Sequence, residues 1–107
     1  MLSYVSKLWW LLVAHAMTDY VWQTEAMGRY KSRRSDPPDY LGPWWWHLAA
    51  HGLINGGAVA WVTGNLWLGM AEFCVHCSLD FMKCEGMISA KQDQAGHVVS
   101  KLVWALA

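Results

Sequence analysis

The sequence is short of charge. Charged residues make up 15% of its 107 residues, whereas an ordinary soluble domain carries about 25%. Eight basic residues balance eight acidic ones, so the chain lacks the basic excess of a nucleic-acid-binding protein, and we expect no nucleic-acid surface. Hydrophobic residues reach 55% and include nine tryptophans. This balance favours a protein that contacts lipid or a large apolar partner.

The sequence also lacks a second C-x-x-C pair. Its cysteines are Cys74, Cys77 and Cys84, which fall within one predicted helix. One C-x-x-C cannot complete a zinc knuckle, and no βαβ pattern surrounds it to indicate redox chemistry. An odd cysteine count disfavours a disulfide-stapled secreted fold. We therefore expect small, reduced helix cysteines.

Long uninterrupted apolar runs are missing as well. No stretch offers the ~20 apolar residues of a simple membrane span, and mean hydropathy is only +0.14. Outside regularly spaced polar positions, however, segments 8–21, 44–68 and 66–81 carry almost no charge apart from Glu72. A soluble four-helix bundle needs charged outer faces. We therefore expect an integral membrane protein surrounded by the lipid bilayer.

Four apolar segments predict four helices within a single domain, 1–107. The segments are 2–27, 43–63, 66–83 and 90–107. Pro43 suits a helix start, and Gly64-Asn65 indicates a tight turn. Small residues let helices approach closely, and the second segment contains Gly52, Gly56 and Gly57. The expected fold is all-α, a four-helix membrane bundle.

Each segment carries two potential metal ligands four residues apart. The pairs are His15/Asp19, His47/His51, His76/Asp80 and Asp93/His97. Residues at this interval share one face of an α-helix, and all five histidines belong to a pair. We expect the helices to point these pairs inward at a common metal site. Asp93 is the weakest member, because the helix dipole alone favours a carboxylate in a first turn.

Other polar residues extend these stripes by about one turn. They are Gln23, Asn55, Glu72 and Lys83, and a further polar residue, Gln94, directly follows Asp93. We expect Lys83 to pair with Asp80 or to hold a substrate anion, and Gln23 and Gln94 to orient ligands or substrate. The alternative is a hydrogen-bonded network that only holds the helices together.

A basic loop broken by prolines follows the first segment, at residues 29–39. In a membrane protein such a cluster is typical of a cytoplasmic anchor, which we prefer to a nucleic-acid patch. The loop that contains Lys83 and Lys91 should lie on the same side, and the turn near Asn65 on the opposite side.

Four runs together resemble the family called domain of unknown function 3307, small membrane proteins of bacteria and their phages. The runs are AHAMTDYVWQTEAMGRYK, HLAAHGLINGG, VHCSLDFMK and QDQAGHVV. The resemblance covers nearly the whole chain apart from residues 35–41. It implies a multi-pass protein of the bacterial inner membrane. The residues carried over are His15, Asp19, Gln23, His47, His51, His76, Asp80, Lys83, Asp93, Gln94 and His97. Their motifs look like those of predicted membrane-bound metal-dependent hydrolases.

Imidazole and carboxylate ligands suit a divalent metal, with zinc expected first and manganese or iron as alternatives. Seven or eight potential ligands exceed the four of a structural zinc site. The surplus indicates two metals that share ligands, or one metal with outer partners and a general base.

These features predict a membrane-embedded hydrolase acting on a phosphoester of a lipid or nucleotide. An ion-binding or transport module and a membrane interaction protein with a structural polar core are the alternatives. The expected partners are the bilayer and an anionic small-molecule or lipid substrate, and a homo-oligomer is left open.

Overall fold

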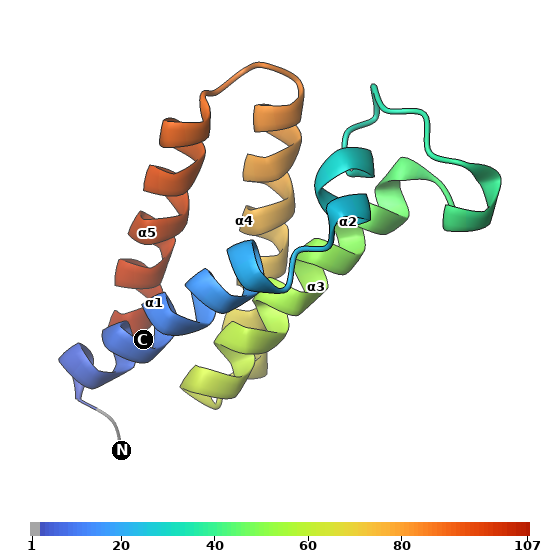
Figure 1. Ribbon diagram of the computed structural model, residues 1–107. Helices are drawn as coiled ribbons and strands as arrows, with labels where there is room; N and C mark the ends of the chain where they lie inside the picture. The colour runs from blue at the N-terminus through green and yellow to red at the C-terminus, as the bar shows by residue number, and fades with distance from the viewer. Residues whose placement is uncertain (1–2) are drawn as a thin grey trace.

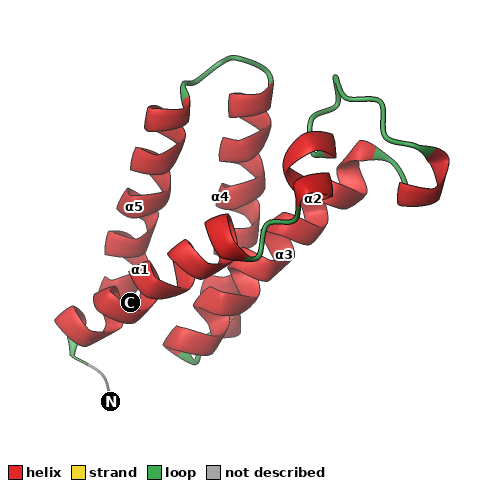
Figure 2. Cartoon of the chain, in the orientation of Figure 1, coloured by secondary structure: helices red, strands yellow, loops and turns green. Residues whose placement is uncertain are grey.

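The computed structural model describes residues 3–107, and every regular element in this range is helical (Figure 2). The prediction of an all-α fold is therefore confirmed. The elements are α1 (Tyr4–Ala16), the π-helical turn η1 (Met17–Val21), α2 (Glu25–Tyr30), the 3-10 turn η2 (Asp39–Leu41), α3 (Trp44–Thr63), α4 (Leu66–Cys84) and α5 (Ala90–Leu106).

The last three predicted helices agree with the structure to within one residue at each end. Helix α3 begins directly after Pro43 and ends at Gly64, whose φ of 67° favours glycine. The Asn65 side chain then accepts hydrogen bonds from the backbone N–H groups of Trp67 and Leu68, which caps α4. The predicted tight turn therefore both ends α3 and starts α4.

The prediction of one continuous helix over 2–27 is wrong. Residue 2 lies outside the described residues, α1 passes into η1, and residues 22–24 then leave the helix before α2 begins. The Thr24 side chain accepts a hydrogen bond from the N–H of Met27 (3.1 Å) and so caps a new helix start. In η1, the N–H of Trp22 donates to the carbonyl of Met17 (2.8 Å), which adds a residue to the turn.

The four long helices form a closed ring in which each contacts two neighbours (Figure 1). Helix α1 packs against α3 and α5, and α4 packs between α3 and α5. Helix α2 lies against α3. The loops before α3 and after α4 lie at one end of this bundle, where the Arg33 Nε donates to Glu85 Oε1 (2.7 Å). The α3–α4 turn lies at the opposite end (Figure 1).

Glycines set the separation of α3 and α4. A Cβ atom added to Gly56 would lie 2.6 Å from the carbonyl oxygen of Gly69, and one added to Gly52 would lie 2.3 Å from Cys77 Sγ. Neither contact is sterically allowed, so the two backbones approach as closely as the missing side chains permit. The neighbouring Gly57 has no such role, since a Cβ there meets nothing within 4 Å.

The apolar core is small and lies at the end where α3 gives way to α4. Leu11, Val59 and Ala105 form it, and Leu8, Val62, Leu68 and Trp104 pack against it. Elsewhere the interior is polar. Among the described residues, the buried polar side chains outnumber the buried apolar ones, which reverses the usual distribution.

Large apolar side chains cover much of the outer surface. Trp61 is 89% exposed and Trp67 is 75% exposed. Within residues 3–107, no helix combines the length and the apolar content that crossing a membrane requires. The structure thus gives no support to the finer prediction of a membrane-spanning bundle.

The glycine contacts generate a test of α3–α4 packing. We expect Gly56→Ala to destabilise the protein by about 1–3 kcal/mol, because the added methyl group forces two backbones apart. Gly57→Ala is the matched control, since its methyl group has free space and alanine favours helix by about 1 kcal/mol. Thermal unfolding followed by circular dichroism measures both variants. Equal melting temperatures for the two would contradict the packing described above.

Candidate metal centre

Six of the eight paired residues bring potential ligand atoms close together inside the helical ring. They form three overlapping groups, and the ligand atoms of each group lie within 4.8 Å of one another. The groups are Asp19, His76 and His97; His51, His76 and Asp80; and Asp80, Asp93 and His97. All six residues are buried, and they come from η1, α3, α4 and α5.

Asp19 reaches this centre from the π-helical turn. One carboxylate oxygen, Oδ1, lies 2.8 Å from His51 Nε2, and Oδ2 accepts a hydrogen bond from the Gln94 amide (2.8 Å). Burial opposes ionisation of Asp19, but contacts with His51, His76 and Gln94 outweigh it and hold the pKa well below its ordinary value. Asp19 is therefore a carboxylate.

His76 and His97 stack at the middle of the site, with ring centroids 4.1 Å apart. Neither ring has any exposed surface, and none of their four ring nitrogens makes a hydrogen bond. His76 Nε2 lies 3.4 Å from Asp19 Oδ1 and 3.5 Å from Asp80 Oδ2. Buried polar atoms are nearly always bonded, so these nitrogens indicate a place for a ligand.

Asp80 is surrounded by cationic groups and imidazoles. Its Oδ2 lies 3.2 Å from Lys31 Nζ and 3.3 Å from His51 Nε2, and its Oδ1 lies 3.3 Å from Lys83 Nζ. Lys83 also lies 3.4 Å from Asp93 Oδ2. Burial opposes the charge of Lys83, but Asp80 and Asp93 outweigh it and raise the pKa. Lys83 is thus a cation between two carboxylates.

Asp93 faces the centre from the first turn of α5. A capping box between Ser89 and Gln92 fixes this helix start. The Asp93 Oδ1 atom lies 3.2 Å from His97 Nε2, and the residue is 1% exposed. The helix dipole is therefore not its sole partner, although the sequence offered that as a sufficient explanation.

His15 flanks the centre instead of joining a ligand group. Its Nε2 is hydrogen-bonded to Gln94 Oε1 (3.1 Å) and lies 3.6 Å from Asp19 Oδ2. Gln94 thus joins His15 to Asp19, and its orienting role stays a prediction.

Two predicted residues lie away from the ligand groups. The His47 ring packs beside Tyr30, with centroids 5.8 Å apart, and belongs to none of the groups. Gln23 accepts a hydrogen bond from Lys31 Nζ (2.7 Å), so it reaches Asp80 only through that lysine.

Sequence reasoning missed a buried ion pair below the centre. Lys101 Nζ donates to Glu72 Oε1 (2.6 Å) and Oε2 (2.9 Å), and Glu72 Oε2 lies 3.6 Å from His76 Nδ1. Burial opposes the charge of Glu72, but His76 and Lys101 outweigh it and lower the pKa to about 2. Lys101 follows His97 by four residues, and this continued spacing is the signal that could have revealed it.

Lys31 was also missed, because we assigned it to the basic surface loop. The structure buries it against Asp80, whereas Arg33 and Arg34 are exposed. A charge in a basic run carries no signal of burial, so the sequence offered no means of separating Lys31 from its neighbours.

The cysteines lie outside the centre on α4 and are free. Burial raises the pKa of the Cys77 thiol to about 11. Among the described residues, neither cysteine of the C-x-x-C belongs to a ligand group.

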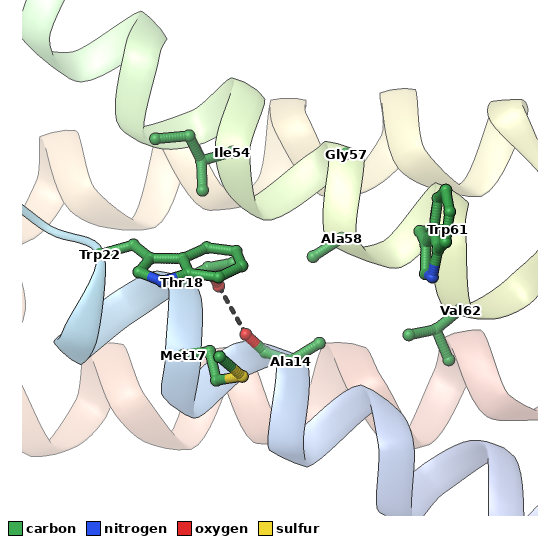
Figure 3. Close-up of a pocket in the computed structure, with 9 residues that line it drawn as sticks. All are labelled: Ala14, Met17, Thr18, Trp22, Ile54, Gly57, Ala58, Trp61 and Val62. Carbon is green, nitrogen blue, oxygen red and sulfur yellow. Dashed lines mark hydrogen bonds between the residues drawn. The ribbon is translucent and has the colours of Figure 1, made fainter.

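An apolar groove of about 410 Å³ lies between α1–η1 and α3. Trp22 and Trp61 stand at opposite ends of it (Figure 3). Its one polar side chain is Thr18, whose Oγ1 lies 2.7 Å from Asn55 Oδ1 and 2.9 Å from the Ala14 carbonyl. Thr18 precedes Asp19 in η1, but neither Asp19 nor any other residue of the ligand groups lines the groove.

The Glu72–Lys101 pair generates a stability test. We expect Lys101→Met to cost about 3–5 kcal/mol, because it leaves a buried carboxylate without its counter-charge. The double variant Glu72→Met/Lys101→Met removes both charges and should recover most of that loss. A double-mutant cycle on thermal unfolding measures the coupling, and additive effects would contradict the pairing.

Comparison with known proteins places the chain in a family. The family described as "Protein of unknown function (DUF3307)" matches residues 8–105. The matched range contains all six residues of the three ligand groups. Comparison with curated proteins and with solved structures gives no match. With nearly its whole length matched, the chain belongs to the DUF3307 family.

Proposed function

We propose that this protein is a metal-dependent hydrolase. The observation that carries the proposal is the pair His76 and His97, whose fully buried Nε2 atoms lie beside the carboxylates of the centre without a hydrogen bond. A purely structural polar core would satisfy these atoms, because an unmade buried hydrogen bond costs about 1–3 kcal/mol. This cost supports a ligand site over a packing network.

The residues of the centre have the ligand atoms that a divalent cation needs, and neighbouring side chains orient these ligands. Three histidines and three carboxylates provide the nitrogen and oxygen ligands that zinc, manganese or iron accept. Glu72 lies behind His76 and can hold its Nδ1–H, which leaves Nε2 as the ligand atom. On the other side of the centre, the Gln94 amide donates a hydrogen bond to Asp19 Oδ2 and so orients this carboxylate.

A divalent cation bound here would supply an activated water as the nucleophile of hydrolysis. Lys83 is the group suited to an anionic substrate, since its side chain is 29% exposed while its ammonium reaches Asp80 and Asp93. An ammonium at that position attracts a phosphate group and stabilises charge that develops on it. A phosphoester is thus the substrate class that we propose.

The apolar outer surface supports lipid as the surroundings of this hydrolase. Exposing a large apolar side chain to water costs about 1.5–3 kcal/mol, and Trp61, Trp67 and Leu66 are each more than two-thirds exposed. Lipid contact would remove this cost. The groove beside η1 is lined almost wholly by apolar side chains, which favours a lipid phosphoester over a nucleotide.

Metal analysis tests the proposal directly. We expect purified protein to contain a divalent metal and to hydrolyse a member of a phosphomonoester and phosphodiester panel. Asp80→Ala should lose metal and activity together, because it removes a ligand from two of the three groups. Protein without metal after purification and after incubation with zinc, manganese or iron would refute the proposal.

Lys83→Ala and Gln23→Ala separate substrate handling from metal binding. An ammonium does not bind a cation, so Lys83→Ala should keep its metal and raise KM for an anionic substrate. Gln23→Ala should also keep its metal but lower turnover by about 10–100-fold, as expected for a residue that orients others. Metal content and steady-state rates are measured side by side. Loss of metal from Lys83→Ala would contradict its assigned role.

Membrane association is measured by fractionating cells that express the chain. We expect the protein in the membrane pellet, resistant to high salt and released by detergent, because apolar contacts are not screened by ions. Replacing Trp61 and Trp67 with glutamate should reduce the pelleted fraction. Quantitative recovery of the unaltered protein in the supernatant would contradict lipid contact.

A further inference from the structure

The three ligand groups overlap in a way that limits how cations can occupy them. Any two groups share one residue: His76 joins the first and second, His97 the first and third, and Asp80 the second and third. No two groups are therefore independent. Two cations could be held at once only if one residue served both.

Asp80 has the geometry of that shared ligand. A carboxylate presents two oxygens, and those of Asp80 face different neighbours. Its Oδ2 lies 3.3 Å from His51 Nε2 and 3.5 Å from His76 Nε2. Its Oδ1 is buried without a hydrogen bond and lies on the side of Lys83.

His76 is less suited to sharing. An imidazole can bridge two cations only through its two opposite nitrogens. The Nδ1 atom of His76 faces Glu72 Oε2 at 3.6 Å, so only Nε2 is directed at the other ligands. This leaves the second and third groups, joined through Asp80, as the pair that can be filled together.

We propose that the centre binds two divalent cations bridged by Asp80, an inference that rests on the proposed metal-dependent function. His51 and His76 complete the first position, and Asp93 and His97 complete the second. Asp19 Oδ1 lies 2.8 Å from His51 Nε2, and a cation at the first position would replace that hydrogen bond, while Asp19 Oδ2 stays bonded to the Gln94 amide. Each position has three protein ligands, which leaves room for water or substrate, as in catalytic sites.

One lysine of the site can make way for a cation. Lys83 Nζ lies 3.3–3.4 Å from both carboxylates of the second position, where it balances charge that a cation would otherwise balance. Its side chain is 29% exposed, so it can withdraw toward solvent when a cation binds. Lys31 donates to Gln23 (2.7 Å) and to Asp80 Oδ2 (3.2 Å) and is 4% exposed, so it remains a competing cation beside the first position.

The test is metal stoichiometry, with Mn(II) or Zn(II) titrated into metal-stripped full-length protein. We expect two cations per chain in the unaltered protein, one in His51→Ala, one in Asp93→Ala and at most one in Asp80→Ala, where only the group of Asp19, His76 and His97 stays intact. His47→Ala is the matched control, because it lies on the same helix as His51 but outside the groups, and it should retain two. Circular dichroism checks that each variant is folded.

Electron paramagnetic resonance of the Mn(II)-loaded, unaltered protein gives a readout that needs no variant. Two ions sharing a carboxylate should give an exchange-coupled spectrum, distinct from the hyperfine pattern of isolated Mn(II). Saturation at one cation, with an isolated-ion spectrum, would overturn the bridged pair and leave the proposed function standing. Binding of no cation would overturn both.

Discussion

A charge that leaves water must meet a partner, and this constraint governs the interior of the protein. Unpaired buried charges are too costly for a domain of this size to tolerate. In the described interior, α4 and α5 face each other through three successive layers of contacts. These are the Glu72–Lys101 ion pair, the stacked rings of His76 and His97, and the Lys83–Asp93 ion pair. The helices run antiparallel, and the members of these layers lie four residues apart along α5 but four and then seven residues apart along α4.

The backbone features of the fold follow from bringing further groups to these layers. The glycines of α3 allow it to approach α4 closely enough for the His51 and His76 rings to lie 4.8 Å apart. The π-helical turn places Asp19 against His51. Such turns interrupt a regular helix and are frequent at functional sites. Glycine lowers the helix propensity of α3, and the π-helical turn departs from regular α-helix geometry. Both features bring polar side chains to the centre.

The same arrangement determines where the apolar side chains lie. With polar groups occupying the ring's interior, tryptophans and leucines of α3 and α4 are left outside. An apolar exterior around a histidine and carboxylate centre links the two parts of the proposed function, lipid surroundings and metal chemistry. Fold alone does not establish activity, and the proposal therefore rests on the unbonded nitrogens of His76 and His97.

The sequence by itself determined the helical fold, three of the four helix spans, and the sharing of a face within pairs such as His76/Asp80, because these depend on local periodicity and capping. It did not determine which faces meet. An interval of four residues places His47 and His51 on one side of α3, but tertiary packing alone sends His51 to the centre and leaves His47 beside Tyr30. Burial of Lys31 and Lys101 was likewise decided by carboxylates distant in the chain. Local sequence sets which side chains a helix presents together, and only the neighbouring helices decide whether they meet a partner, a cavity or the outside.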